Sequence, residues 1–178
     1  MSRTKPGSRW LLILVMIVVI GWPVYQLYGY VVGGPAKQDS TRELYEVSNF
    51  QMSLLGSFLN DSAKLHETTA LDAIKLTAYM ADYTHTRLVS VLGSDRLAAL
   101  ESLPALVSYV SGLQIGGNRP LKEQESATLA AVKELFQAMD GAYGKLLSSG
   151  GSVIASENSE VGKLDTEITE LLRGNILQ

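Results

Sequence analysis

The chain has 178 residues, a formal net charge of −3 and a hydrophobic fraction of 46%, a size typical of one compact domain plus a short extension. It contains no cysteine, which excludes disulfides, thiol catalysis and cysteine-ligated metal sites. All 18 acidic residues follow Ala36, and the basic residues in the same part of the chain are scattered and form no stripe. Because clustered cations are needed to neutralise phosphates, the sequence predicts no nucleic-acid partner.

The first feature along the chain is an uncharged, strongly apolar segment. No charged residue occurs between Trp10 and Ala36. About 20 apolar residues span the core of a bilayer, so the sequence predicts a transmembrane helix over residues 10–32 and the lipid bilayer as a partner. Aromatic side chains prefer the two membrane interfaces, and those expected to anchor the helix there are Trp10, Trp22, Tyr25, Tyr28 and Tyr30.

Three basic residues, Arg3, Lys5 and Arg9, precede this segment and predict its orientation. An excess of Lys and Arg marks the cytoplasmic side, so we expect residues 1–9 in the cytoplasm and the rest of the chain outside the cell membrane. Two alternatives stay open. The segment resembles a signal peptide in its basic start and apolar run, but it lacks small residues where cleavage would occur. A buried core helix of a soluble protein is the other.

Residues 33–40 contain two glycines and a proline and predict a linker, followed by one extracytoplasmic domain over residues 41–178. In the first helix of that domain, mainly apolar residues recur at intervals of three and four, which is typical of a helix facing a core. The expected core stripe is Leu44, Val47, Gln51, Leu54 and Phe58, flanked by Phe50 and Leu55.

The second helix is expected to begin at Thr68 or Thr69 and to end at Gly93. Its core seam is Leu71, Ile74, Ala78, Ala81, His85, Leu88 and Leu92. Ser94 and Asp95 are predicted to open a third helix that reaches Leu113. Pro104 marks either a kink in that helix or a restart capped by Ser102.

A glycine-rich turn precedes Pro120, which fits the first position of a fourth helix. The seam of that helix is Leu129, Val132, Phe136, Met139, Tyr143 and Leu146. A loop reaching about Asn158 separates it from a last helix, which places Val161, Leu164, Ile168 and Leu171 on one side. The predicted fold class is therefore all-α: a single N-terminal transmembrane helix followed by an antiparallel bundle of four to five amphipathic helices.

The sequence carries no motif for nucleophilic catalysis or phosphate binding, so we expect a protein that is not an enzyme and has no cofactor. Asp82 and His85 have the spacing of half a bundle metal site, but the other half is missing and no metal is predicted. His85 is better explained as a packed histidine or as a pH-sensing group. Tyr79, Tyr83 and His85 form a candidate ligand cleft.

One anchor followed by an exterior helical bundle resembles the periplasmic sensing module of bacterial chemoreceptors and kinases, although those proteins have a second membrane helix and an output domain. Residues 45–59 and the segment Arg119-Pro120-Leu121-Lys122-Glu123 are similar to the helical N-terminal half of spore-germination proteins of the YpeB type. Both likenesses rest on patterns shared by amphipathic helices in general, so the sequence assigns no family.

The sequence leaves two functional hypotheses. The first is a single-pass protein of the cell envelope whose bundle binds another protein, as a scaffold or accessory subunit. The second is an extracytoplasmic sensing module that recognises a small molecule, in a cleft between helices, or a change in pH.

Overall fold

The computed structural model describes residues 35–176, and side chains from Ser40 to Asn175. The predicted membrane helix over residues 10–32, its interface aromatics and the basic residues before it lie outside this range. Among the described residues, no helix combines the length and apolar character needed to cross a bilayer. The chain divides into two compact units between Ser40 and Thr41, and the second unit contains the described helices from Thr41 onward.

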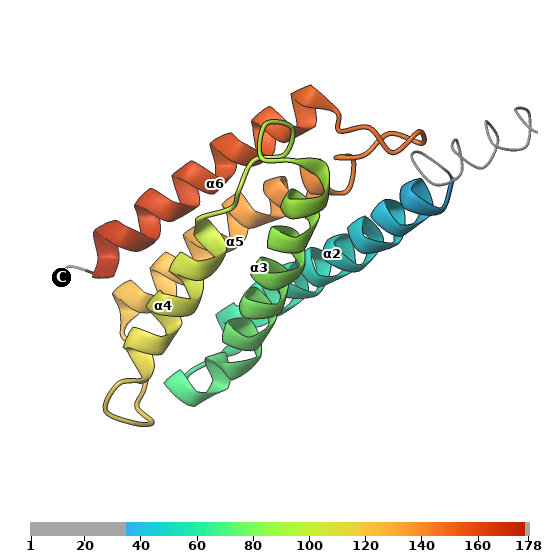
Figure 1. Ribbon diagram of the computed structural model, residues 1–178. Helices are drawn as coiled ribbons and strands as arrows, with labels where there is room; N and C mark the ends of the chain where they lie inside the picture. The colour runs from blue at the N-terminus through green and yellow to red at the C-terminus, as the bar shows by residue number, and fades with distance from the viewer. Residues whose placement is uncertain (1–34, 177–178) are drawn as a thin grey trace, which may run out of the picture. The chain divides into compact units, whose positions relative to one another are not determined.

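Five α-helices make up the described part of the chain: α2 (Pro35–Asp61), α3 (Asp72–Leu92), α4 (Ser102–Gln114), α5 (Glu123–Tyr143) and α6 (Ala155–Ile176). Two 3-10 turns, Ser62–Lys64 and Thr68–Leu71, join α2 to α3. Consecutive helices run in opposite directions, with α5 packed along α6 and α4 packed against α3 and α6 (Figure 1). Strand pairing over residues 35–176 is limited to two isolated bridges, which confirms an all-helical bundle.

Several helix boundaries differ from those expected. α2 begins at Pro35, inside the predicted linker, and α6 begins at Ala155 rather than near Asn158. α5 begins at Glu123 instead of Pro120, because Pro120 pairs with Glu67 in one of the isolated bridges.

The largest difference is at α4, which begins at Ser102 and not at Asp95. Gly93 ends α3 as predicted, with a positive φ of 99° that favours glycine. The chain between Gly93 and Ser102 then forms irregular structure. The restart at Ser102 allowed by the sequence is therefore the arrangement found, with Pro104 in the first turn of α4, where a proline removes no helical hydrogen bond.

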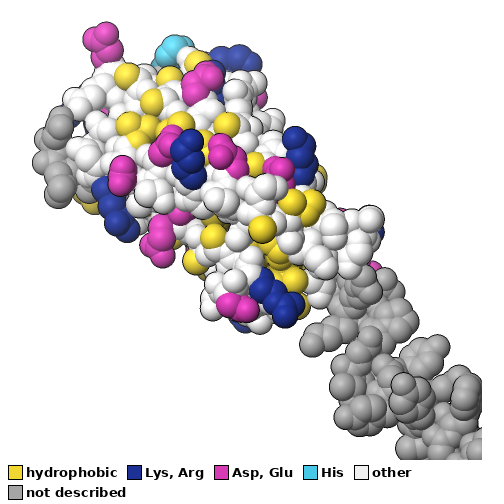
Figure 2. Space-filling model, turned by 90° about the horizontal axis from the view of Figure 1, so that it is seen from above, with side chains coloured by type: hydrophobic (Ala, Val, Ile, Leu, Met, Phe, Trp, Pro, Cys, Tyr) yellow, Lys and Arg dark blue, Asp and Glu magenta, His cyan; other side chains and the backbone are white. Residues whose placement is uncertain are grey.

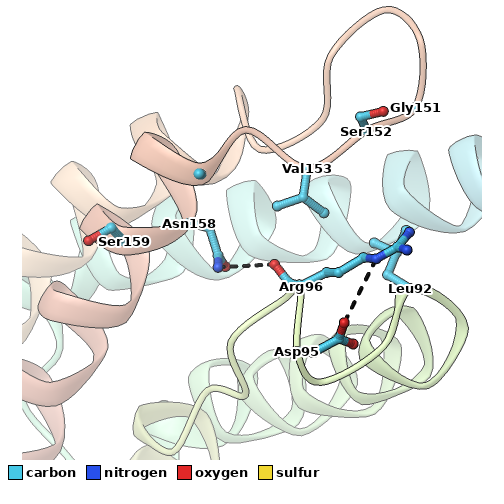
Figure 3. Close-up of a pocket in the computed structure, with 9 residues that line it drawn as sticks. Leu92, Asp95, Arg96, Gly151, Ser152, Val153, Asn158 and Ser159 are labelled. Atoms are coloured by element: carbon cyan, nitrogen blue, oxygen red, sulfur yellow. Dashed lines mark hydrogen bonds and ion pairs between the residues drawn. The ribbon is translucent and has the colours of Figure 1, made fainter.

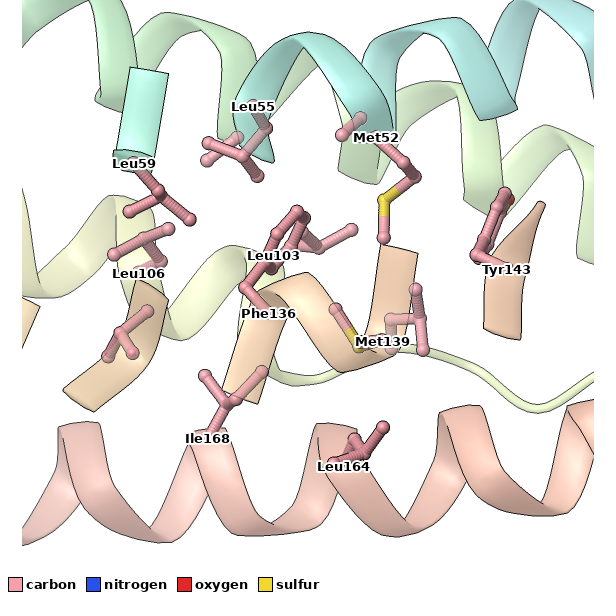
Figure 4. Close-up of a cluster of buried hydrophobic side chains, with 14 of the residues drawn as sticks. Met52, Leu55, Leu59, Leu103, Leu106, Phe136, Met139, Tyr143, Leu164 and Ile168 are labelled. Carbon is pink, nitrogen blue, oxygen red and sulfur yellow. The ribbon is translucent and has the colours of Figure 1, made fainter. Parts of the chain in front are cut away.

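The core forms where α5 passes between the other helices (Figure 4). Every predicted seam residue of α5 is buried, and Phe136, Met139 and Tyr143 are at most 1% exposed. The α3 seam is also confirmed: all of its predicted residues are buried except Leu92, which is partly exposed. In α6 the buried apolar residues are Val161, Leu164, Ile168 and Leu172, so the last predicted position is off by one.

The predicted core face of α2 is wrong by one residue. The buried positions are Tyr45, Ser48, Met52, Leu55 and Leu59, whereas Val47 is 49% and Phe50 62% exposed. The helix carries apolar side chains on two adjacent faces, and the buried face contains a serine that periodicity alone counts as polar. Ser48 is tolerated there because its hydroxyl forms a hydrogen bond to the hydroxyl of Tyr143.

This correction is testable with two neighbouring leucines. We expect Leu55→Ala, at a fully buried position, to lower the free energy of unfolding by about 2–5 kcal/mol through lost burial and a cavity. Leu54→Ala, at a partly exposed position, should cost at least ~1 kcal/mol less. Chemical denaturation of both variants measures the difference, and equal losses would contradict a core face centred on Leu55.

Candidate functional site

The structure does not bring the three residues of the predicted ligand cleft together. Tyr79 and Tyr83 are 59% and 54% exposed on the outer face of α3, whereas His85 is 1% exposed on the inner face of the same helix. Residues 79 and 83 lie one turn apart, but residue 85 is turned away from both because each residue advances the helix by about 100°. The tyrosines therefore belong to a surface and the histidine to the core.

His85 is held by hydrogen bonds at both ring nitrogens. Nε2 lies 2.8 Å from the carbonyl oxygen of Ala98, and Nδ1 lies 2.9 Å from the hydroxyl of Tyr143. A carbonyl can only accept, so Nε2 carries the proton and Nδ1 accepts from Tyr143. Burial lowers the pKa of His85, against the opposing effects of the Ala98 carbonyl and the charge of Asp165, so the ring is neutral at pH 7.

The hydroxyl of Tyr143 is the centre of a buried polar chain. Since it donates to His85, it accepts from the hydroxyl of Ser48 at 2.6 Å, while the hydroxyl of Tyr45 donates to the Tyr143 carbonyl oxygen at 2.8 Å. Burial raises the pKa of Tyr143, which keeps the phenol protonated. The chain of hydrogen bonds connects α2, α5, α3 and the irregular segment that contains Ala98.

Two side chains of α6 hold the same irregular segment from the other side. Asn158 accepts from the backbone N–H of Ala98 at 3.1 Å and donates to the carbonyl oxygen of Arg96 at 3.1 Å. Asp165 accepts from the N–H groups of Glu101 and Ser102, at 3.0 and 2.9 Å. Asp165 is only 5% exposed and acts as the N-terminal cap of α4, supplied by a different helix.

Sequence reasoning missed Asn158 and Asp165. The available signal was the position of Asp165 directly after the seam residue Leu164, at the edge of a buried face where carboxylates are rare unless they are paired. Which backbone groups such a carboxylate would meet depends on the neighbouring helix, and sequence periodicity carries no information about that neighbour.

A cleft of about 520 Å³ opens beside the irregular segment between α3 and α4. It lies between the turn after α3, the loop before α6 and the first turn of α6 (Figure 3). Its lining includes Leu92, Arg96, Ser152, Val153 and Asn158. The volume is within the range of small-molecule sites. The Asn158 amide that borders it is already hydrogen-bonded to Arg96 and Ala98.

The outer face of α3 carries the longest run of exposed apolar side chains among residues 40–175. Leu76, Tyr79, Met80 and Tyr83 are between 41% and 61% exposed and recur at intervals of three and four, so they share one face of the helix. Asp72 and Arg87 stand at the two ends of this face. The guanidinium of Arg87 lies 5.1 Å from the centroid of the Tyr83 ring, within the range of a cation–π contact. These six residues form the α3 stripe.

An ion pair lies at the start of α5, at the end of the bundle away from the cleft. Arg119 donates to both carboxylate oxygens of Glu125, at 2.8 and 2.6 Å, and the backbone N–H of Lys122 donates to Glu125 at 2.9 Å. The hydrogen bonds from Arg119 lower the pKa of Glu125. Glu125 is 9% exposed and so occupies the edge of the α5 seam, where it caps the helix. This arrangement is structural.

The charged side chains of the described residues are scattered and do not gather into a metal site. Among residues 35–176, no group of three or more histidine or carboxylate side chains could hold a metal ion. The face seen in Figure 2 shows acidic and basic side chains interspersed with apolar ones and no basic stripe.

No protein-family model matches the chain, and neither the curated proteins nor the solved structures include a significant match.

The buried histidine predicts a pH dependence of stability. The unfolded state takes up a proton near pH 6.5, whereas the folded state resists protonation because the pKa of His85 is lowered. The free energy of unfolding should therefore fall as the pH drops below 6.5. In His85→Gln, whose amide can keep both hydrogen bonds, that slope should be reduced. Urea titrations between pH 5 and 8 measure it.

The control for this prediction is His66→Gln, at the only other histidine and an exposed one. This variant should keep the slope of the parent chain. A slope abolished by His66→Gln and retained by His85→Gln would reverse the assignment.

The cap supplied by Asp165 gives a second prediction. Asp165→Ala should lower the free energy of unfolding by about 1–3 kcal/mol, because it leaves two backbone N–H groups of α4 without an acceptor. Asp165→Asn keeps one acceptor oxygen and should lose less. Asp95→Ala, at an exposed position on the same connection, is the matched control and should change stability by under ~0.5 kcal/mol. Thermal melting of the three variants ranks them.

Proposed function

We propose that the chain is a non-enzymatic, single-pass membrane protein of the cell envelope, whose extracytoplasmic helical bundle binds another protein as a scaffold or accessory subunit. The anchor is residues 10–32, oriented by Arg3, Lys5 and Arg9, with the bundle facing outward. The protein partner meets the α3 stripe.

The observation that carries this proposal is the exposed aromatic and aliphatic side chains of the α3 stripe. Tyr and Met are enriched in the cores of protein interfaces, where charged residues are depleted. The stripe has this composition, with its two charged residues at the ends. A contiguous apolar strip with a charged rim is typical of a surface that becomes buried on binding.

The test is site-specific photo-crosslinking in the cells that make the protein. A photoreactive amino acid at Tyr79 or at Tyr83 should give adducts of higher mass on illumination, in the membrane fraction. The same amino acid at Glu134, an exposed position of α5, is the control and should give none. Absence of adducts at both tyrosines, with a normally folded protein, would refute binding through α3.

The location is tested separately by protease treatment of intact cells. A tag after Gln178 should be digested, and a tag before Arg3 should be protected. The reverse pattern, or recovery of the full-length chain in an aqueous fraction without detergent, would overturn the anchoring half of the proposal.

A second candidate function is the binding of a small polar molecule, favoured by the 520 Å³ cleft beside Arg96 and Asn158. A ligand of this cleft should raise the melting temperature in proportion to the logarithm of its concentration. Arg96→Ala should remove that shift, whereas the exposed Arg42→Ala should retain it. A screen in which no compound gives an Arg96-dependent shift would reject this candidate.

A further inference from the structure

We infer that the partner of the α3 stripe is a second copy of this chain, packed antiparallel so that the two α3 helices cross at a twofold axis between Tyr79 and Met80. This inference rests on the proposed function, since it uses the same surface, and it names the occupant.

The spacing of the stripe residues along α3 is the same counted from either end. Counting four residues inward from Asp72 reaches Leu76, and counting four inward from Arg87 reaches Tyr83. Tyr79 and Met80 are left at the centre. In an antiparallel pair related by a twofold axis at that centre, each residue of the stripe therefore faces its counterpart from the other end.

The side chains brought together in this register suit one another. Leu76 faces Tyr83 of the second copy, an apolar pair, and Tyr79 faces Met80, a favourable contact between a sulfur and an aromatic ring. Lys75, which flanks the stripe, faces Thr84 in this register. Asp82 is opposite position 77, where Thr77 is only 4% exposed and belongs to the core, so no like charges meet. The central positions exclude water, and the polar residues stand at the rim.

The charges at the two ends are complementary. Asp72 of each copy faces Arg87 of the other, which gives two identical ion pairs. The Asp72 side chain is 69% exposed and contacts Lys75 and Gln114 through one oxygen, Oδ1, so its second oxygen is available. No ion pair to Arg87 occurs among residues 40–175. A parallel arrangement in register would place Asp72 against Asp72 and Arg87 against Arg87, so the charges select the antiparallel one.

The contact extends over about four turns of one helix, roughly 22 Å from Asp72 to Arg87 at the standard rise. An interface of this length lies at the small end of the known range, so we expect a dimer that dissociates on dilution. Chains anchored in one membrane would be held at a raised effective concentration, which favours the dimer there.

Charge exchange tests the register. The Asp72→Arg chain is basic at both ends of the stripe, and the Arg87→Asp chain is acidic at both ends. At low ionic strength, where surface charges are least screened, each purified full-length variant in detergent should dimerise at least about tenfold more weakly than the parent chain. An equimolar mixture of the two variants should recover the dimer, because both ends of a mixed pair are then complementary.

Analytical ultracentrifugation measures the dimer fraction, and the comparison between each variant alone and the mixture is made on the same folded chains. A mixture that dimerises no more than its components overturns the inference. A parent chain that stays monomeric at every concentration tested also overturns it.

Disulfide trapping tests the direction of packing. Because the chain has no native cysteine, any disulfide that forms must involve the introduced residues. Met80→Cys should form covalent dimers under mild oxidation, because this position lies directly beside the twofold axis and close to its own copy. Asp72→Cys and Arg87→Cys should each fail to couple alone but should couple when mixed. Glu134→Cys, on an exposed face of α5, is the control. Self-coupling of Asp72→Cys would indicate parallel packing and refute the inference.

The photo-crosslinking experiment separates this inference from the proposed function. Adducts at Tyr79 with the mass of two chains agree with the dimer. Adducts with a different polypeptide alone leave the proposed function standing and reject the second copy as the partner. No adduct at either tyrosine rejects both.

Discussion

The hydroxyl of Tyr143 is the point on which the arrangement of the bundle depends. It is buried among α2, α3 and α5, accepts a hydrogen bond from Ser48 and donates one to His85, and His85 in turn donates to the carbonyl of Ala98. Each polar group in this series of hydrogen bonds would be costly to bury alone, because an unpaired polar group in the core loses its hydration without compensation. The three helices are therefore held in one register relative to one another, a constraint that apolar packing alone would leave loose.

The same constraint explains why the connection between α3 and α4 is ordered without being helical. His85 holds Ala98 from one side, and Asn158 and Asp165 of α6 hold the backbone from Arg96 to Ser102 from the other. The side chains of His85, Asn158 and Asp165 thus hold the bundle together, and burial lowers the pKa of His85. The α3 stripe and the cleft beside Arg96, by contrast, lie on the outside of the bundle.

The exposed stripe and the buried histidine belong to the same helix, and that relation gives the stripe its rigidity. The inner face of α3 is fixed by Ile74, Ala78 and Leu88, which are at most 1% exposed. The outer side chains therefore project from a backbone that cannot rotate without breaking the core. A rigid helix face loses little conformational freedom on binding, which suits recognition by a second helix.

Sequence periodicity alone determined the helical class, the seams of α3 and α5, and the end of α3 at Gly93, because these follow from local spacing and from the conformational freedom of glycine. It also placed Tyr79 and Tyr83 on a helix but grouped them with His85, whose burial only the packed bundle reveals. Three other features were decided by tertiary structure: the core face of α2, the late start of α4 and the cap supplied by Asp165. In each of them a side chain meets a group from a distant part of the chain, as Ser48 meets Tyr143, and local spacing contains no record of such a partner.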